Sequence, residues 1–418
     1  MGFSSRAAAG PAAAPAPIAE ADRLKVMDVL RGFALLGIFL MNIEFFNLPM
    51  QMYGAGVVPG QGIDTIAGLF VHLFVTGKFW VLFALLFGMG FAIMRERAAA
   101  AGRPFVGLYL RRCVLLMLFG ALHIVLMWAG DILFAYSIAA MFLLALLWLR
   151  GTPALVGGVL LYAVMAALWL MWGVGMTYMP DEVMAAVREQ AAATVAQGAQ
   201  AAQVFREGDF AAIAHQRIAD YGVFFAGAVI FQIPMMVGVF LVGSWLIGTG
   251  KLREPASHRG FFSGLAIGGL VIGGAGVAGS AAIGTHFDLV NQLPQATIAL
   301  GLNALASLPM ALGYLGVLVL ATISPLGRWL RALAPAGRMA LTNYLMQSLI
   351  ASLVFYGYGL GMFGDMGRAA QVGFVLVVFA AQVVFSQWWL SRYRMGPMEW
   401  LWRAGTYLTL PAMRRVAT

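Results

Sequence analysis

Long apolar stretches recur along almost the whole chain, and short polar connections separate them. Each stretch has about 18 or more residues with few charges, which is the length that an α-helix needs to cross the hydrocarbon core of a bilayer. The pattern therefore predicts an all-α, polytopic membrane protein with about ten transmembrane helices in one domain, residues 23–392. The predicted stretches are 29–49, 64–94, 110–127, 131–149, 153–178, 221–249, 261–284, 294–322, 338–360 and 369–392.

The composition supports this interpretation, because 62% of the 418 residues are hydrophobic and only 10% are charged. Soluble domains carry about 25% charged residues. The net charge of +9 does not indicate a nucleic-acid partner, since the basic residues are scattered between apolar stretches and do not gather on one polar face. The expected partner is the lipid bilayer. Cys113 is the only cysteine, which excludes an intramolecular disulfide.

The distribution of Lys and Arg predicts the orientation in the membrane. If successive connections alternate between the two sides, 21 of the 26 Lys and Arg residues lie on one side. Cytoplasmic connections carry the excess of positive charge, so both termini are expected in the cytoplasm. Residues 1–22, rich in Ala and Pro, are expected to form a disordered cytoplasmic tail. Residues 393–418 are expected to form a cytoplasmic C-terminal tail.

One connection on the opposite side is much longer than the others. Residues 179–220 are rich in Ala, Gln and Glu and contain few helix breakers, which favours one or two helices outside the bilayer. Such a segment could act as a lid or serve only as a spacer. No repeat of fixed period is present, so the sequence predicts a single membrane domain.

Ionisable residues inside apolar stretches are the best candidates for function, because an unpaired charge at membrane depth is costly. Asp28 and Arg31 open the first stretch and lie three residues apart, which places them on one helix face at the cytoplasmic boundary. There they could anchor the helix or bind an anionic group. Asn42 follows Arg31 by eleven residues, about 16 Å along the helix axis.

The depths of several polar residues predict a shared layer in the outer half of the membrane. His72 and His123 each lie about 12 Å from the outer end of their stretches, the second and the third. If the first three stretches are neighbours, Asn42, His72 and His123 come together. Glu44 and Asp131 would then lie nearer the outer surface. This layer is the expected reaction centre.

Imidazole suits proton transfer near neutral pH, and a neighbouring carboxylate can fix its tautomer. His123 beside Asp131 is therefore the first candidate for the base, and His72 is the second. Either histidine could instead be a packing residue. Lys78 lies deeper and needs a partner or water; Lys78 and Glu44 are candidates for substrate binding. No metal is expected, because no HExxH or other close ligand spacing is present.

Four ordered segments resemble the YeiB family of bacterial inner-membrane proteins. They are GKFWVLFALLFGMGFAIMRER, LMLFGALHIVLMWAGDILFAYSIAA, AGRMALTNYLMQSL and GPMEWLWRAGTY. The likeness extends from Asp28 to Tyr407, which is nearly the whole chain. It implies a multi-pass protein of the bacterial inner membrane.

A more distant resemblance links the first stretch to the transmembrane acyltransferase superfamily, which includes sugar O-acyltransferases and the heparan glucosaminide N-acetyltransferase. DVLRGFALLGIFLMN is similar to the first-helix pattern of that superfamily, in which an acidic residue and Arg-Gly open the helix. Asn42 stands where the O-acyltransferases place a histidine. The heparan enzyme type is similar to this chain in having an asparagine at that position. Arg31 and its basic neighbours would suit the phosphates of a cytoplasmic acyl-CoA co-substrate, so Asp28 and Arg31 are the candidate residues of the donor site.

Three classes of function remain open at this point. The first is an acyltransferase that passes an acyl group from a cytoplasmic acyl-CoA-type donor to a hydroxyl or amine of an envelope glycan or a small molecule. The second is a transporter or export component in which the same residues bind substrate or relay protons. The third is a membrane scaffold whose polar residues only join helices. The sequence leaves open whether the chain forms a homo-oligomer.

The predicted orientation can be tested with topology reporters. A reporter fused after Thr418 should be active only in its cytoplasmic form, and single cysteines placed within 179–220 should react with a thiol reagent that does not cross membranes. The reason is the 21 to 5 division of Lys and Arg between the two sides. A C-terminal reporter active only outside the cytoplasm would contradict the even number of spans.

Overall fold

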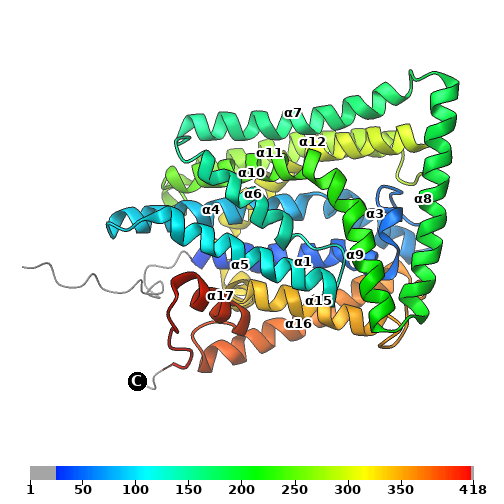
Figure 1. Ribbon diagram of the computed structural model, residues 1–418. Coiled ribbons are helices and arrows are strands. Elements are labelled where there is room, and N and C mark those ends of the chain that lie inside the picture. The colour runs from blue at the N-terminus through cyan, green and yellow to red at the C-terminus, as the bar shows by residue number, and fades with distance from the viewer. Residues whose placement is uncertain (1–24, 416–418) are drawn as a thin grey trace, which may run out of the picture.

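The computed structural model describes residues 25–415, and these residues fold almost entirely into helices (Figure 1). Eight helical segments are long and apolar enough to cross a membrane, and two shorter apolar helices occupy the fourth and ninth predicted stretches. The prediction of an all-α, polytopic membrane protein is confirmed. The expected tail over residues 1–22 lies outside the described residues.

Ten helices form the bundle and lie roughly along one direction in Figure 1. They are α1 (Lys25–Asn42), α4 (Lys78–Ala100), α5 (Phe105–Leu126), α6 (Leu133–Ala145), α7 (Thr152–Met176), α10 (Ile233–Gly248), α11 (Arg259–Ile283), α12 (Leu293–Thr322), α15 (Ala340–Phe355) and α16 (Arg368–Arg392). The other α-helices are α2 (Glu44–Asn47), α3 (Ile63–Phe74), α8 (Asp181–Glu207), α9 (Phe210–Gly227), α13 (Gly327–Leu330), α14 (Ala334–Arg338) and α17 (Pro397–Tyr407). Short helical turns are η2 (Met50–Met52), η3 (Ala228–Gln232), η4 (Pro255–His258) and η5 (Arg331–Leu333).

The second predicted stretch, 64–94, is broken into α3 and α4. The chain leaves helical geometry between Phe74 and Lys78, and Gly77 has a φ of +87°, in the left-handed region that glycine adopts readily. A break at membrane depth exposes backbone polar groups, and it is tolerated where the break is buried in protein or lines a cavity. The sequence pattern did not reveal the break because both halves are equally apolar.

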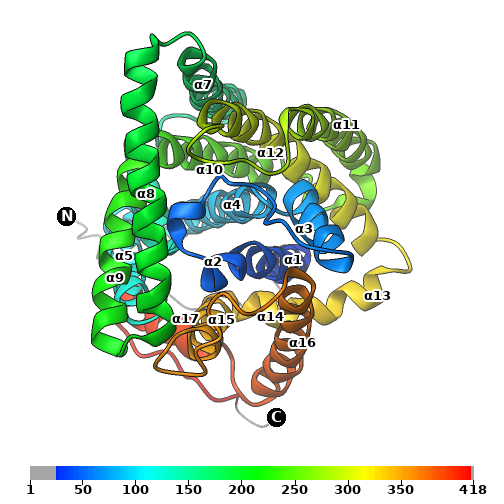
Figure 2. The same ribbon diagram turned by 90° about the vertical axis from the view of Figure 1, so that its right-hand side faces the viewer.

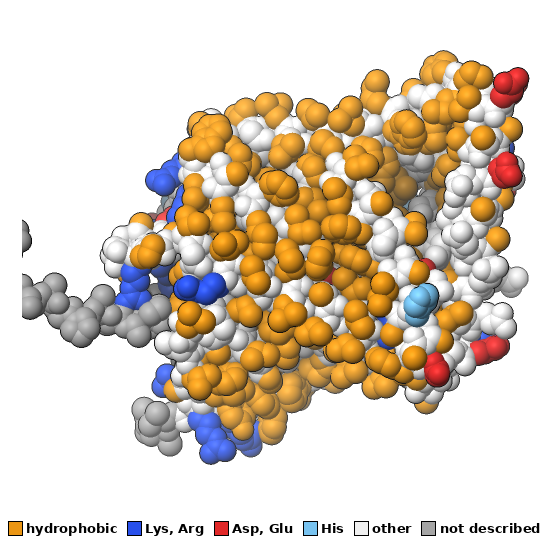
Figure 3. Space-filling view, viewed as in Figure 1, with side chains coloured by type: hydrophobic (Ala, Val, Ile, Leu, Met, Phe, Trp, Pro, Cys, Tyr) orange, Lys and Arg blue, Asp and Glu red, His pale blue; other side chains and the backbone are white. Residues whose placement is uncertain are grey.

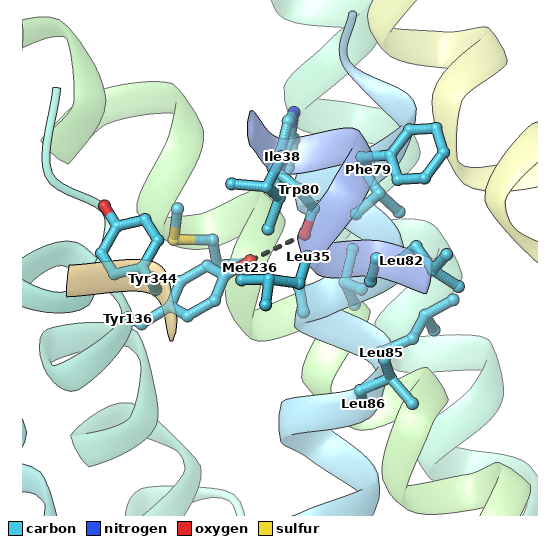
Figure 4. Packing of buried hydrophobic residues seen from close by; sticks show 14 of the residues in the cluster. Leu35, Ile38, Phe79, Trp80, Leu82, Leu85, Leu86, Tyr136, Met236 and Tyr344 are labelled. Atoms are coloured by element: carbon cyan, nitrogen blue, oxygen red, sulfur yellow. Dashed lines mark hydrogen bonds between the residues drawn. The ribbon is translucent and has the colours of Figure 1, made fainter. Parts of the chain in front are cut away.

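The packing of α1 against α4 forms the centre of the hydrophobic core. Figure 4 shows Leu35 and Ile38 of α1 facing Phe79, Trp80 and Leu82 of α4. The hydroxyl of Tyr136, from α6, donates to the backbone carbonyl of Trp80 at 2.7 Å. This bond fixes the start of α4 to α6 and satisfies a buried hydroxyl.

The glycine-rich helix α11 packs closely along α12. A Cβ atom added to Gly269 would lie 2.5 Å from the backbone nitrogen of Gly313, so neither helix has room for a larger residue there. Close approach of backbones through small residues is a common way for helices to associate in lipid, where no hydrophobic driving force acts between them.

Helix α8 crosses one end of the bundle almost at right angles to the spanning helices, and α9 returns from it (Figures 1 and 2). Phe205 of α8 stacks on Tyr356 with a ring separation of 5.0 Å and on Phe363 with one of 5.3 Å. Arg206 forms an exposed ion pair with Asp365. The long connection expected outside the bilayer is thus helical over most of its length and packs against the connection between α15 and α16.

Charged side chains separate toward the two ends of the molecule. Figure 3 shows a wide band of hydrophobic side chains, with Lys and Arg side chains at the left end and Asp and Glu side chains at the right end. The left end, where α17 lies in Figure 1, is the end expected to face the cytoplasm.

Helix α17 is held against the bundle by Glu399. The carboxylate of Glu399 accepts hydrogen bonds from the backbone N–H groups of Leu341 and Thr342, at 2.7 and 3.1 Å, and from the Thr342 hydroxyl at 2.6 Å. It thereby caps the first turn of α15. Burial raises the pKa of Glu399, and the hydrogen bonds from Thr342 oppose that rise. The guanidinium carbon of Arg112, from α5, also lies 3.6 Å from the centroid of the Trp402 ring.

Replacing Glu399 tests this attachment. Glu399→Ala should lower the free energy of unfolding by about 1–3 kcal/mol, because three donors at the start of α15 lose their acceptor. Glu399→Gln should lower the free energy of unfolding by less, since the amide oxygen of glutamine can accept from the backbone and its amide nitrogen can donate to Thr342. Thermal unfolding of the purified protein in detergent measures both. Equal losses in the two variants would show that the charge, and not the hydrogen-bond pattern, holds α17 in place.

Candidate functional site

A cavity of about 200 Å³ lies within the bundle. Its wall includes the end of α1, the connection from α2 to α3, the break between α3 and α4, the connection from α5 to α6, and parts of α9, α11 and α12. Segments far apart in the sequence therefore meet around one partly open cavity. Pockets of this kind are the usual place for a ligand.

Asn42 and His72, two of the three residues predicted to share a layer, line this cavity. Glu44 and Asp131, predicted to lie nearer the outer surface, line it as well. Asn42 is only 9% exposed, and its side-chain amide has no hydrogen-bond partner within residues 25–415. The ring nitrogens of His72 also make no hydrogen bond to a described residue. Both side chains are thus available to a molecule inside the cavity.

His123 and Asp131 form a buried pair beside the cavity. His123 Nδ1 lies 2.8 Å from Asp131 Oδ1, and both side chains are fully buried. The other oxygen of Asp131 accepts from the backbone N–H of Phe134 at 2.7 Å, so Asp131 also caps the start of α6. His123 Nε2 has no hydrogen-bond partner among the residues that the structure describes.

The two members of this pair differ in their access to the cavity. Asp131 lines it, together with Trp128, whereas His123 does not. Helix α5 ends at Leu126, and the chain then turns back so that Trp128 packs against His123 with ring centroids 6.4 Å apart. The expected layer therefore exists, but His123 stands behind its wall. Rise along a helix predicts depth and gives no information about the path of the following connection.

Lys78 lies at the first position of α4 and is completely buried. Its ammonium group donates to Asn303 Oδ1 at 2.5 Å and to the backbone carbonyl of His72 at 3.4 Å. Asn303, from α12, lines the cavity, and Lys78 lies behind it. The sequence indicated that Lys78 needs a partner, but Asn303 is more than two hundred residues away and was missed.

Glu44 is also paired across the bundle. Arg368, at the start of α16, places a guanidinium nitrogen 3.1 Å from Glu44 Oε2 and is 8% exposed. The guanidinium further donates to Gln371 at 2.6 Å and to the carbonyl of Leu40 at 3.3 Å. Glu44 therefore presents to the cavity a carboxylate that already has a cationic partner.

Asp28 and Arg31 lie near the opposite end of α1 and do not line the cavity. Arg31 donates to Asp28 Oδ1 at 3.1 Å, and the Arg31 side chain remains 29% exposed. The same-face pair expected from the spacing is present. The exposed part of Arg31 leaves room for an anionic group at this end of the bundle.

The connection from α2 to α3 forms a roof over the cavity, with Leu48, Tyr53 and Val57 among its lining residues. The roof is joined to the connection between α11 and α12, because Val57 N–H donates to the carbonyl of Thr285 at 2.6 Å. It is also joined to α9, since the amide of Gln51 donates to Asp220 at 2.8 Å. Neither partner could be inferred from the sequence.

No cluster of three or more His, Cys, Asp or Glu side chains suited to a metal ion occurs in the part of the chain described here. The side chains that line the cavity include the imidazoles of His72 and His286, the carboxylates of Glu44 and Asp131, and the amides of Asn42, Gln232 and Asn303.

Comparison with known proteins gives the relatives of this chain. Residues 246–409 match the family model described as "Protein of unknown function (DUF418)". The uncharacterized protein YxaH of Bacillus subtilis (strain 168) is 33% identical over 409 residues, covering 94% of this chain and 96% of YxaH. The uncharacterized protein YeiB of Escherichia coli (strain K12) is 33% identical over 403 residues, covering 91% of this chain and 96% of YeiB.

A third relative, an uncharacterized 39.9 kDa protein of Bacillus acidopullulyticus, is 26% identical over 399 residues. No solved structure matches the chain. The identity to YxaH and YeiB extends over nearly the full length of both relatives. The chain therefore belongs to the DUF418 family that includes YeiB and YxaH.

Proposed function

We propose that this protein is an acyltransferase of the bacterial inner membrane. It would transfer an acyl group from a cytoplasmic acyl-CoA-type donor to an acceptor bound in the cavity. The observation that most supports this proposal is the convergence of Asn42, His72, Glu44 and Asp131 on one cavity inside an apolar bundle. Ionisable and amide groups are costly at membrane depth and commonly mark a substrate path.

The reaction needs a base, a polarising donor and an enclosed site. The hydroxyl or amine of the acceptor attacks the thioester carbonyl carbon, and its proton passes to His72, whose imidazole lines the cavity. The C–S bond breaks, and the leaving CoA thiolate takes up the proton that His72 received, which restores the neutral imidazole. The amide N–H of Asn42 would donate to the carbonyl oxygen as negative charge develops on it.

The pair of His123 and Asp131 would act as a positioning element. Asp131 lies on the same cavity wall as His72 and would present its carboxylate to the bound acceptor. His123 holds Asp131 in place through the bond of 2.8 Å and has no direct access to the cavity. Geometry thus favours His72 over His123 as the group that meets the acceptor.

The donor would bind at the other end of α1. Arg31 is partly exposed there and is oriented by Asp28. The distance along α1 from Arg31 to Asn42 is about 16 Å, so the flexible arm of an acyl-CoA has to extend along this helix toward the cavity. Phosphate groups suit the planar guanidinium, which can hold two oxygens at once.

Substitution of the two histidines tests the assignment of the base. His72→Gln should lower turnover by about 100-fold or more, the usual scale for loss of a positioned acid or base, with folding and donor binding retained. His123→Gln should reduce turnover less, by about tenfold, because it acts only through Asp131. Turnover of purified protein in liposomes with a radiolabelled acyl-CoA measures both effects.

The opposite order of the two effects would return the base role to His123. Full activity of the variant that lacks both histidines would exclude a mechanism based on imidazole. Uptake of a solute into liposomes, with no acylated product, would favour the transport alternative.

Substitution of Arg31 tests the donor site. Arg31→Lys should weaken donor binding by about tenfold or more, because lysine keeps the charge and loses the planar fork that holds two phosphate oxygens. Arg331→Lys, at an exposed arginine also expected on the cytoplasmic side, is the matched control and should bind donor normally. Donor affinity is read from a titration with the CoA thioester. Unchanged affinity in Arg31→Lys would support the interfacial-anchor interpretation of Asp28 and Arg31.

A further inference from the structure

The lining of the cavity restricts the chemistry of whatever binds there. We infer that the acceptor is a small, uncharged and largely apolar alcohol, and that it is neither a glycan nor an anion. The inference rests on the proposed function only in that it calls the ligand an acceptor. The binding chemistry itself is independent of whether an acyl group is transferred.

The wall of the cavity is mainly apolar and carries several aromatic rings. These rings come from α2, the roof, the start of α4, the α5–α6 connection, α9 and the α11–α12 connection. The aromatic lining residues are Phe45, Tyr53, Trp80, Trp128, Phe224 and Phe287. Such a wall favours the binding of an apolar or aromatic group, because burying apolar surface stabilises the complex.

Several polar lining side chains are already engaged within the protein. The hydroxyls of Ser280 and Thr76 donate to backbone carbonyls at 2.8 and 3.3 Å. Asn303 Oδ1 accepts a hydrogen bond from Lys78 at 2.5 Å. The lining side chains whose polar groups make no hydrogen bond to any described residue are Asn42, Tyr53, His72, Trp80, Gln232 and His286.

The free polar groups come from six different segments of the chain, and the rest of the wall is mainly apolar. Every hydroxyl that a ligand buries without a partner costs roughly 1–3 kcal/mol. A sugar would have to match several hydroxyls to these separate groups at once, so it is disfavoured relative to a compound with a single hydroxyl. A single hydroxyl can donate to one free group and accept from the Asn42 amide, which offers both a donor and an acceptor.

The charges around the cavity exclude an anion and disfavour a cation. Among the described residues no Lys or Arg side chain lines it, whereas Glu44 and Asp131 do, so a carboxylate or phosphate would lie beside two carboxylates with no ammonium or guanidinium group on the wall. Both carboxylates already have partners, Arg368 and His123, at 3.1 and 2.8 Å. An ammonium group of a ligand would have to share these carboxylates with Arg368 and His123. The remaining chemistry is that of an uncharged hydroxyl on an apolar body.

Binding of matched small molecules to the full-length protein in detergent micelles tests this inference. The probes are 2-phenylethanol, 2-phenylethylamine, phenylacetate and glucose, and the readout is the ligand-induced rise of the unfolding temperature, titrated to give an affinity. We expect 2-phenylethanol to bind most tightly, 2-phenylethylamine more weakly, and phenylacetate and glucose not at all at the same concentrations. No acyl donor is present, so the result does not depend on turnover.

Variants locate the binding to the cavity. Asn42→Leu keeps the side-chain volume and removes both hydrogen-bonding groups, so it should weaken the binding of 2-phenylethanol by about tenfold. Gln232→Met, at a half-buried position, is a second and milder variant and should weaken it by a few-fold. Gln190→Leu, an exposed amide on α8, is the control and should leave binding unchanged.

Each contrary result has a definite meaning. Tighter binding of the amine, of phenylacetate or of glucose, or no binding of 2-phenylethanol, overturns the inferred ligand class. Equal binding by Asn42→Leu, Gln232→Met and the unmodified protein overturns the cavity as the site. Binding as expected without acyl transfer in the liposome assay would retain the ligand class and reject the proposed enzyme activity.

Discussion

Polar groups at membrane depth must find partners inside the protein or in a cavity, because lipid offers none, and the centre of this molecule is arranged around that constraint. Lys78 is the clearest case. It is fully buried at the first residue of α4, immediately after the break in the second span, and Asn303 of α12 satisfies its ammonium group. The break is therefore stabilised by a helix that lies far away in the sequence, and the cavity occupies the space that the break leaves open.

The same constraint explains how the cavity obtains its chemistry. Glu44 is kept in place by Arg368 of α16, and Asp131 by His123 of α5 and by the start of α6. The carboxylates are thus oriented before any ligand arrives. Asn42 and His72 are among the exceptions, since neither side chain has a hydrogen-bond partner among the described residues. Groups left free in an otherwise satisfied interior are the ones that a ligand can use.

The sequence predicted the depth of the site better than its contacts. Helical rise is constant, so the heights of Asn42 and His72 followed from counting residues, and both line one cavity. The position of His123 behind the cavity wall could not be predicted by counting residues, because it depends on how the chain turns after α5. The partners of Lys78 and Glu44 were missed for a related reason: Asn303 and Arg368 come from helices whose neighbours no local pattern reveals.

The roof of the cavity has a consequence for the speed at which molecules enter and leave. Gly54 and Gly56 hold it at φ values of +100° and +79°, and it is fastened to both α9 and the connection between α11 and α12. Opening it requires at least one of these attachments to break, which is a local unfolding event. Passage of molecules through the roof itself is then limited by the frequency of that event. Such openings accelerate steeply on warming, so passage through the roof is expected to accelerate with them.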